Sequence, residues 1–187
     1  MLQTANTIPL EQDKIYHIYN RANGSEKLFL SQQDYLRFID RLKICLLPCA
    51  EFYAYCLLPN HFHFLLRIIA TTNNFSRSMS NFSNSYAKYF NLKYGRKGGL
   101  FMTPFKRKLI ETDASLAWIT WYIHRNPLHH GFSNDWQNWQ WSSYKAYISK
   151  SNTAIQTSYL LNFFGGPDQL IRHHRINQEG CIEKDMQ

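Results

Sequence analysis

The sequence lacks the features that would assign it to a membrane, secreted or disulfide-rich class. No CxxC pair is present, and the four cysteines, Cys45, Cys49, Cys56 and Cys181, are too few for a disulfide scaffold. No apolar run approaches the length of a membrane span. The first residues show no basic segment followed by an apolar one, as a secretory signal would. We therefore expect a soluble cytoplasmic protein that does not enter a membrane.

Acidic side chains are scarce: 13 Asp and Glu stand against 21 Lys and Arg, which gives a net charge of +8. This excess favours a polyanionic partner, above all nucleic acid, although a basic surface without a partner would have the same composition. The 187 residues suit one domain with a small appendage. We predict a main domain over residues 1–150 and a partly flexible C-terminal extension over residues 151–187.

Hydrophobic periodicity predicts strands over residues 14–21, 51–58, 61–69 and 100–111. Helices are predicted over residues 31–48 and 73–94, and a further helix is capped by Asp113 and stopped by Pro127. Residues beyond about Gly166 are polar and are expected to be loosely held. The order matches an α+β, ferredoxin-like βαββαβ antiparallel sheet with an added C-terminal helix that carries a tyrosine. In that plan the first and third strands lie in the centre of the sheet.

Two histidines lie one residue apart in the third strand, within "CLLPNHFHFLLRI". Because successive strand residues point to opposite faces, His61 and His63 share one face and Phe62 and Phe64 share the other. Two imidazoles in fixed register can bind one metal ion or one phosphate. Two alternatives stay open: histidines satisfied by backbone carbonyls at the edge of the core, and a structural zinc site that includes Cys45 and its neighbour Cys49.

The last predicted helix offers a third ligand and a nucleophile. Tyr122 and Asn126 are four residues apart and project from one helix face, while Leu116, Ile119 and Ile123 form an apolar stripe that docks the helix. An amide oxygen from Asn126 can complete a His-His-Asn site for Mg²⁺ or Mn²⁺. The Tyr122 hydroxyl can act as a covalent nucleophile. With 12 tyrosines in the chain, a packing role for Tyr122 is the alternative.

The segment "LLPNHFHFLL", followed downstream by "YIHRNP", resembles the single-tyrosine HUH transposases, in which U is a hydrophobic residue. The REP-associated tyrosine transposases are the most similar branch. The segments "YHIYNRANGSEKLF", "SYAKYFNLKYGRKGGLF", "FKRKLIE", "YIHRNPLHHG" and "WQWSSY" resemble that family in the same order. The likeness covers roughly residues 15–147. One departure is Met102-Thr103-Pro104 ahead of Phe105-Lys106, where relatives often have Gln or Gly followed by Arg.

This resemblance implies roles for single residues. His61 and His63 are the implied metal ligands, Tyr122 the catalytic tyrosine and Asn126 the third ligand, with Mg²⁺ or Mn²⁺ as the cofactor. The implied activity is metal-dependent nicking and strand transfer of single-stranded DNA through a 5′-phosphotyrosine intermediate. A domesticated, non-catalytic nucleic-acid-binding regulator with the same fold is the alternative. Some family members complete each active site across a homodimer, so the oligomeric state stays open.

Basic residues cluster at the end of the long helix and on the strand that follows it, interleaved with aromatic residues. Such a mixture suits single-stranded or hairpin DNA. The predicted DNA-binding residues are Lys88, Lys93, Arg96, Lys97, Lys106, Arg107 and Lys108. We interpret His124, His129 and His130 as surface or phosphate-adjacent residues without a catalytic role.

Overall fold

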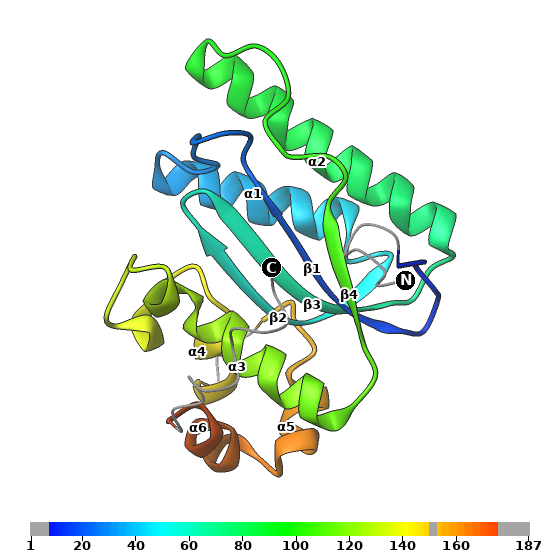
Figure 1. The fold of residues 1–187 in the computed structure, drawn as a ribbon, viewed down its shortest axis with the longest axis vertical. Coiled ribbons are helices and arrows are strands. Elements are labelled where there is room, and N and C mark those ends of the chain that lie inside the picture. The colour runs from blue at the N-terminus through cyan, green and yellow to red at the C-terminus, as the bar shows by residue number, and fades with distance from the viewer. Residues whose placement is uncertain (1–7, 150–152, 176–187) are drawn as a thin grey trace.

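Four strands form one antiparallel sheet in a computed structural model that describes residues 8–149 and 153–175. The strands are β1 (Ile15–Arg21), β2 (Ala50–Leu58), β3 (His61–Ile68) and β4 (Lys106–Ile110), in the spatial order β2-β3-β1-β4. β1 and β3 therefore lie in the centre, as expected for the βαββαβ plan. The predicted fold class is confirmed, and both histidines of the HxH pair lie on a central strand (Figure 1).

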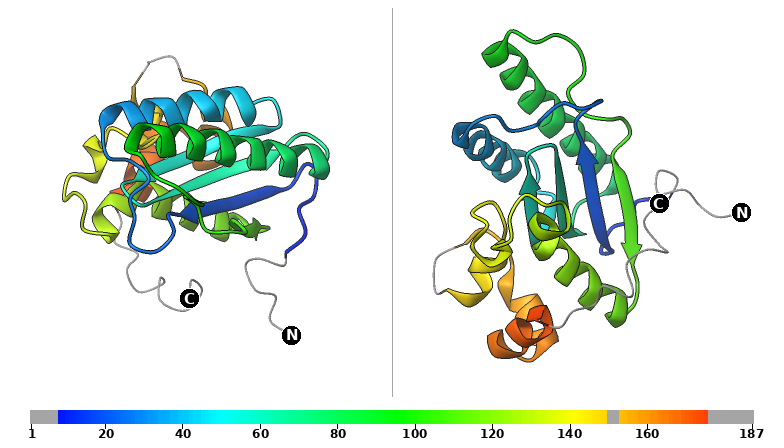
Figure 2. Two further views of the ribbon diagram at one scale, coloured as in Figure 1. Left: turned by 90° about the horizontal axis from the view of Figure 1, so that it is seen from above. Right: turned by 60° about the vertical axis from the view of Figure 1, so that its left-hand side comes forward.

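Two helices, α1 (Gln32–Cys45) and α2 (Thr72–Tyr94), cover one face of the sheet (Figure 2). Their inward aromatics meet the phenylalanines of β3: Phe38 of α1 has its ring centroid 5.3 Å from that of Phe62. Phe62 and Phe64 are completely buried. The burial of these rings fixes the register of β3, because a slip by one residue would move the histidines into the core.

The opposite face of the sheet carries α3 (Asp113–His129), which packs on β2 and β3. Leu116, Ile119 and Ile123 of α3 are buried, so the predicted apolar stripe does dock the helix. Shorter helices follow: the 3₁₀ helix η1 (Trp136–Asn138), then α4 (Tyr144–Ile148), α5 (Thr157–Phe164) and α6 (Pro167–Arg175). None of the helices in residues 8–149 and 153–175 is both long enough and apolar enough to cross a membrane.

A buried carboxylate fixes the start of α1. Asp34 accepts hydrogen bonds from the backbone N–H groups of Leu30 and Ser31 at 2.9 and 2.8 Å, and Ser31 and Asp34 together form a capping box at the start of the helix. Lys93 of α2 donates to the same carboxylate at 2.7 Å. The carboxylate thus joins the two helices of this layer, and its hydrogen bonds hold the pKa of Asp34 at about 2 despite burial.

The bounds of α3 differ from the prediction at both ends. Thr112, not Asp113, caps the helix, because its hydroxyl accepts the backbone N–H of Ser115 at 3.1 Å. The helix also continues through Pro127 to His129. Proline lacks a backbone N–H, but its φ angle suits a helix. The helix continues for only two residues beyond Pro127. The extra residues carry the chain on to His130.

The last strand is shorter than predicted, because only Lys106–Ile110 pairs with β1. The preceding residues form a loop that crosses the end of β1, where Phe101 makes an isolated bridge to Ala22. The Asn20 amide donates to the carbonyl of Met102 at 2.9 Å and holds this loop beside the sheet.

The region beyond Gly166 is more ordered than predicted. α6 packs against the body through Leu170 and His174, both fully buried. His174 Nδ1 donates to the Leu170 carbonyl, so its Nε2 accepts the proton of His124 Nδ1 at 2.8 Å. The prediction that His124 is a surface or phosphate-adjacent residue is therefore wrong. Residues 176–187 lie outside the described part of the chain, and the boundary at residue 150 stays a prediction.

This buried pair makes stability depend on pH. Burial lowers the pKa of His174 to about 4, so between pH 6.5 and 4 the unfolded chain binds a proton that the folded chain does not. The contribution of neutral His174 to the free energy of unfolding is present above pH 6.5 and falls as the pH is lowered. About 2 kcal/mol of this free energy is lost between pH 7.5 and pH 5. Urea unfolding at these two pH values should show the wild type losing more stability than His174→Gln by this amount. Equal losses would exclude His174 as the source.

Candidate active site

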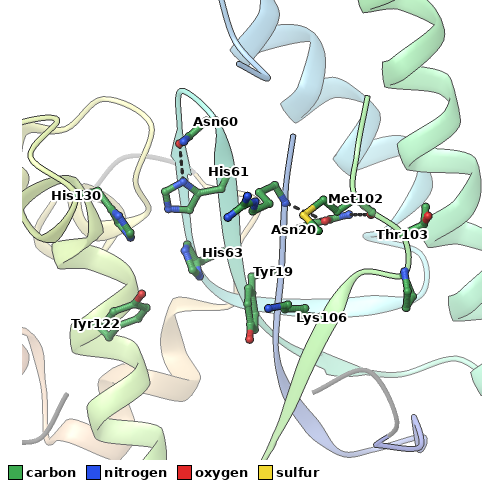
Figure 3. A pocket seen from close by; sticks show the side chains of 12 residues that line it. Tyr19, Asn20, Asn60, His61, His63, Met102, Thr103, Lys106, Tyr122 and His130 are labelled. Atoms are coloured by element: carbon green, nitrogen blue, oxygen red, sulfur yellow. Dashed lines mark hydrogen bonds between the residues drawn. The ribbon is translucent and has the colours of Figure 1, made fainter. Parts of the chain in front are cut away.

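His61 and His63 project from the face of β3 that α3 partly covers. Opposite residues of neighbouring antiparallel strands share a face. Tyr19 of β1 is the partner of His63 of β3, so it lies on this face as well. The predicted arrangement is confirmed to this extent: the imidazoles point away from the helical layer of α1 and α2. Figure 3 shows both rings at one cleft, together with Tyr122 of α3.

The Nδ1 atom of His61 is paired and its Nε2 atom is not. Nδ1 lies 2.7 Å from the side-chain oxygen of Asn60, an atom that can only accept a hydrogen bond. His61 therefore carries its proton on Nδ1, which leaves a lone pair on Nε2. That Nε2 atom is buried and has no hydrogen-bond partner within residues 8–149 and 153–175. A donor-bearing Nδ1 held by a neighbouring oxygen is the usual support of a metal-binding imidazole.

His63 is held by a second histidine, His17 of β1. His63 Nδ1 and His17 Nε2 are 2.9 Å apart, and the rings stack with centroids 5.1 Å apart. Only the tautomer in which His63 Nδ1 donates to His17 leaves a lone pair on His63 Nε2, which is buried and without a partner. His17 is therefore positioned to set the protonation of the His63 imidazole, a role that sequence reasoning missed.

A third imidazole, that of His130, completes a cluster at this cleft. Ligand atoms of His61, His63 and His130 all lie within 4.8 Å of one another. The ring of His130 packs edge-on against that of His61, with centroids 4.5 Å apart. Sequence reasoning gave His130 no part in the site. Within the described ranges, these three residues are the only such group of His, Cys, Asp or Glu side chains.

The cysteines of the zinc alternative lie elsewhere. Cys49 lies near the hydroxyl of Ser78, with Sγ and Oγ 3.2 Å apart, and Cys45 is half-buried on α1. Neither belongs to the histidine cluster. The described residues therefore give no support to a zinc site that joins these cysteines to His61 and His63.

Tyr122 of α3 borders the same cleft, and Asn126 lies one helical turn further along α3. The ring of Tyr122 stacks on Trp118, with centroids 5.1 Å apart, and packs edge-on against His63 at 5.6 Å. Asn126 is fully buried, and its amide nitrogen donates to the Tyr122 carbonyl at 2.9 Å. Among the described residues its Oδ1 atom is buried and has no hydrogen-bond partner of normal geometry, but the Asn126 side chain lies close enough to His61 to raise the pKa of that imidazole against the effect of burial. The structure thus brings Tyr122 and Asn126 to the two histidines, as the helical spacing predicts.

Burial governs the protonation of the cleft. It lowers the pKa of His61 to about 4, and it lowers the pKa of His63 well below its ordinary value. Both imidazoles are therefore neutral at pH 7, as metal ligands must be. Burial also raises the pKa of Tyr122 to about 12, with the Asn126 side chain acting in the opposite direction. The phenol keeps its proton at neutral pH unless another group or an ion assists its loss.

The cleft has a volume of about 410 Å³ and extends from Tyr122 and the imidazoles past the end of β1 to the Met102–Pro104 loop. Lys106 lines it, with Nζ 6.0 Å from the ring centroid of Tyr19. Lys108 pairs with His17 across β1 and β4 and therefore lies on the same face. A cationic margin beside an aromatic ring suits a nucleic-acid strand.

The other predicted DNA-binding residues do not all face this cleft. Lys93 is paired with Asp34, and Arg96 forms a salt bridge with Glu26, so acidic side chains already neutralise both cations. Arg107 points to the other face of the sheet, where it donates to the carbonyl of Ile8. Two further residues lie away from the cleft: Lys88 on α2 and Lys97 in the loop after that helix.

Comparison with known proteins adds two relatives. A curated protein of Haemophilus influenzae (strain ATCC 51907 / DSM 11121 / KW20 / Rd), named for the REP-associated tyrosine transposases, is 26% identical over 103 residues, which is 50% of this chain and 58% of that protein. A solved structure of a REP-associated tyrosine transposase bound to a REP hairpin superposes with a TM-score of 0.62 at 17% identity, covering 76% of this chain and 84% of that one. No model of a known protein family matches the chain.

The chain resembles the REP-associated tyrosine transposases in sequence and in fold. The family resemblance of the sequence motifs is confirmed by these two findings. The chain spans 58% of the length of the curated relative, and the solved relative, at 17% identity, shows the fold alone.

Proposed function

We propose that this protein is a DNA strand transferase that nicks single-stranded or hairpin DNA and rejoins it through a covalent phosphotyrosine. One observation carries the proposal: Tyr122 borders the same cleft as two neutral imidazoles whose Nε2 atoms have no partner in the described part of the chain. The named relatives, one of which was solved with a REP hairpin, support DNA as the substrate. The cationic margin formed by Lys106 and Lys108 supports it as well.

The donor set fits a divalent cation. His61 Nε2, His63 Nε2 and Asn126 Oδ1 are buried polar atoms without hydrogen-bond partners, which is costly unless something occupies the space between them. Two imidazoles with one amide oxygen suit Mn²⁺, and Mg²⁺ in combination with water. When bound, the cation would supply Lewis-acid stabilisation of the charge that develops on the scissile phosphate.

The chain's own residues then account for the chemistry. The Tyr122 oxygen attacks phosphorus and loses its proton, while the bond from phosphorus to the 3′ oxygen of the preceding nucleotide breaks and that oxygen takes up a proton. The product is a 5′-phosphotyrosine and a free 3′-hydroxyl. Attack by a 3′-hydroxyl reverses the step, so rejoining needs no external source of energy.

The proposal is tested by a denaturing gel. The protein is incubated with labelled single-stranded and hairpin DNA in the presence of Mn²⁺ or Mg²⁺, and we expect a labelled band at the mass of protein plus DNA that disappears when EDTA is added first. A protein that binds these substrates in a native gel, but gives no covalent band with either ion, would be a DNA-binding regulator, and the proposal would be wrong.

The third metal ligand can be assigned by comparing two variants. Asn126 offers a buried oxygen, which Mn²⁺ prefers, whereas His130 offers an exposed imidazole, which Zn²⁺ prefers. We expect Asn126→Ala to weaken Mn²⁺ binding by at least about 10-fold and His130→Ala to weaken Zn²⁺ binding more than Mn²⁺ binding. Titration of both ions by calorimetry measures this directly. A larger loss in His130→Ala for both ions would make His130 the third ligand.

A further inference from the structure

A second basic groove lies on the far side of the sheet from the candidate active site. It runs between α1 and α2, has a volume of about 580 Å³ and is lined by four cations: Arg37, Arg41, Lys88 and Lys93. These helices cover the face of the sheet opposite to His61 and His63 (Figure 2). The groove is therefore separate from the cleft that holds Tyr122.

The arginines of the groove have no acidic partner in the part of the chain that the structure describes. Arg37 and Arg41 are half-buried, and their Nε atoms are inaccessible to water and make no hydrogen bond. Within residues 8–149 and 153–175, neither guanidinium takes part in a salt bridge. Lys93, by contrast, is neutralised by Asp34. An anion bound in the groove would supply the partner that these two guanidinium groups do not find among the described residues.

The geometry suits phosphates more than bases. Arg37 and Arg41 are four residues apart on one face of α1, about 6 Å along the helix, and Lys88 lies across the groove on α2. The guanidinium of Arg37 and the ammonium of Lys93 both lie over the ring of Tyr89, at 5.6 and 5.5 Å from its centroid. With cations over its ring, Tyr89 is not available to stack a nucleobase.

We propose that this groove binds the phosphate backbone of double-stranded DNA, such as a hairpin stem or a flanking duplex. Arginine forks bind phosphate oxygens in pairs, and contacts to the backbone carry no sequence information. The groove therefore adds sequence-independent affinity on a surface remote from Tyr122. The choice of DNA as the polyanion rests on the proposed function, whereas the groove itself rests on Arg37 and Arg41.

The test compares two double variants that remove equal charge. Arg37→Gln with Arg41→Gln removes the groove arginines, and the control, Lys43→Gln with Arg77→Gln, removes exposed cations of the same two helices outside the groove. Binding of a blunt DNA duplex without single-stranded ends is measured by fluorescence anisotropy over a range of NaCl concentrations. Log affinity falls with log salt, and we expect the steepness of this fall to be smaller by about 2 in the groove variant and nearly unchanged in the control.

A third variant separates charge from folding. Arg37→Lys with Arg41→Lys keeps both charges and should retain most of the slope, even if the packing around α1 is disturbed. Equal slopes in the groove variant and the control would overturn the proposal. The proposal would also be overturned if the groove variant lost as much affinity for a single-stranded oligonucleotide as for the duplex, because the arginines would then contact the strand that enters the cleft of Tyr122. The denaturing gel is independent of this measurement: a covalent band with unchanged duplex binding would refute the groove alone, and the reverse result would refute only the nicking activity.

Discussion

Tyr122→Phe is expected to bind DNA but to form no covalent product, a loss of more than about a thousand-fold in the rate of adduct formation. The substitution removes only the hydroxyl, so the ring still stacks on Trp118 and packs against His63. No other atom of this ring can attack phosphorus. Denaturing gels with labelled single-stranded DNA measure the adduct, and native gels with the same DNA measure binding.

A neighbouring tyrosine provides the control for this variant. Tyr19 lines the same cleft and stacks on His17, with ring centroids 4.7 Å apart. Tyr19→Phe removes a hydroxyl from the same cleft and should still give the covalent band. If Tyr122→Phe gave undiminished adduct, or if Tyr19→Phe alone abolished it, Tyr122 would not be the nucleophile.

His63→Leu is expected to reduce the affinity for Mn²⁺ by more than about 100-fold, since even the loss of an outer-shell partner costs 10- to 100-fold. Leucine fills much of the space of the buried ring but offers no lone pair. The covalent band should disappear together with the metal. Electron paramagnetic resonance of free Mn²⁺ measures binding without reference to activity, and retained binding in this variant would refute the metal site.

Two further histidines refine this result. His17→Leu removes the acceptor of His63 Nδ1 and should weaken Mn²⁺ binding by about 10- to 100-fold, whereas His17→Gln keeps an acceptor there and should retain more of the affinity. His174→Leu breaks an equivalent imidazole pair at α6, away from the cleft, and should leave the affinity unchanged within about threefold. If His174→Leu had the same effect as His17→Leu, general destabilisation would explain both.

The sequence was sufficient to predict features that depend on local periodicity. The period of two along β3 places His61 and His63 on one face, and the period of the helix places Tyr122 beside Asn126. These predictions need no knowledge of the tertiary fold beyond the order of the strands. They identify the residues that the structure brings together at the cleft.

Features that depend on contacts distant in sequence could not be predicted in this way. The pairing of His17 with His63 depends on the register of β1 against β3, 46 residues apart. The position of His130 depends on α3 continuing past Pro127, where a proline normally indicates a stop. The sequence predicts that Lys93 binds DNA, and it does not show that Asp34, 59 residues away, already pairs with this lysine.

Tyr122, the proposed nucleophile, and the histidines of the cleft lie together within one chain, because α3 packs directly on the strands β2 and β3 of its own sheet. A single molecule therefore holds every side chain that the proposed cleavage step requires. Cutting should accordingly be first order in protein concentration: dilution would reduce the number of cuts in simple proportion, and not with the square that a shared site between two weakly associated copies would give.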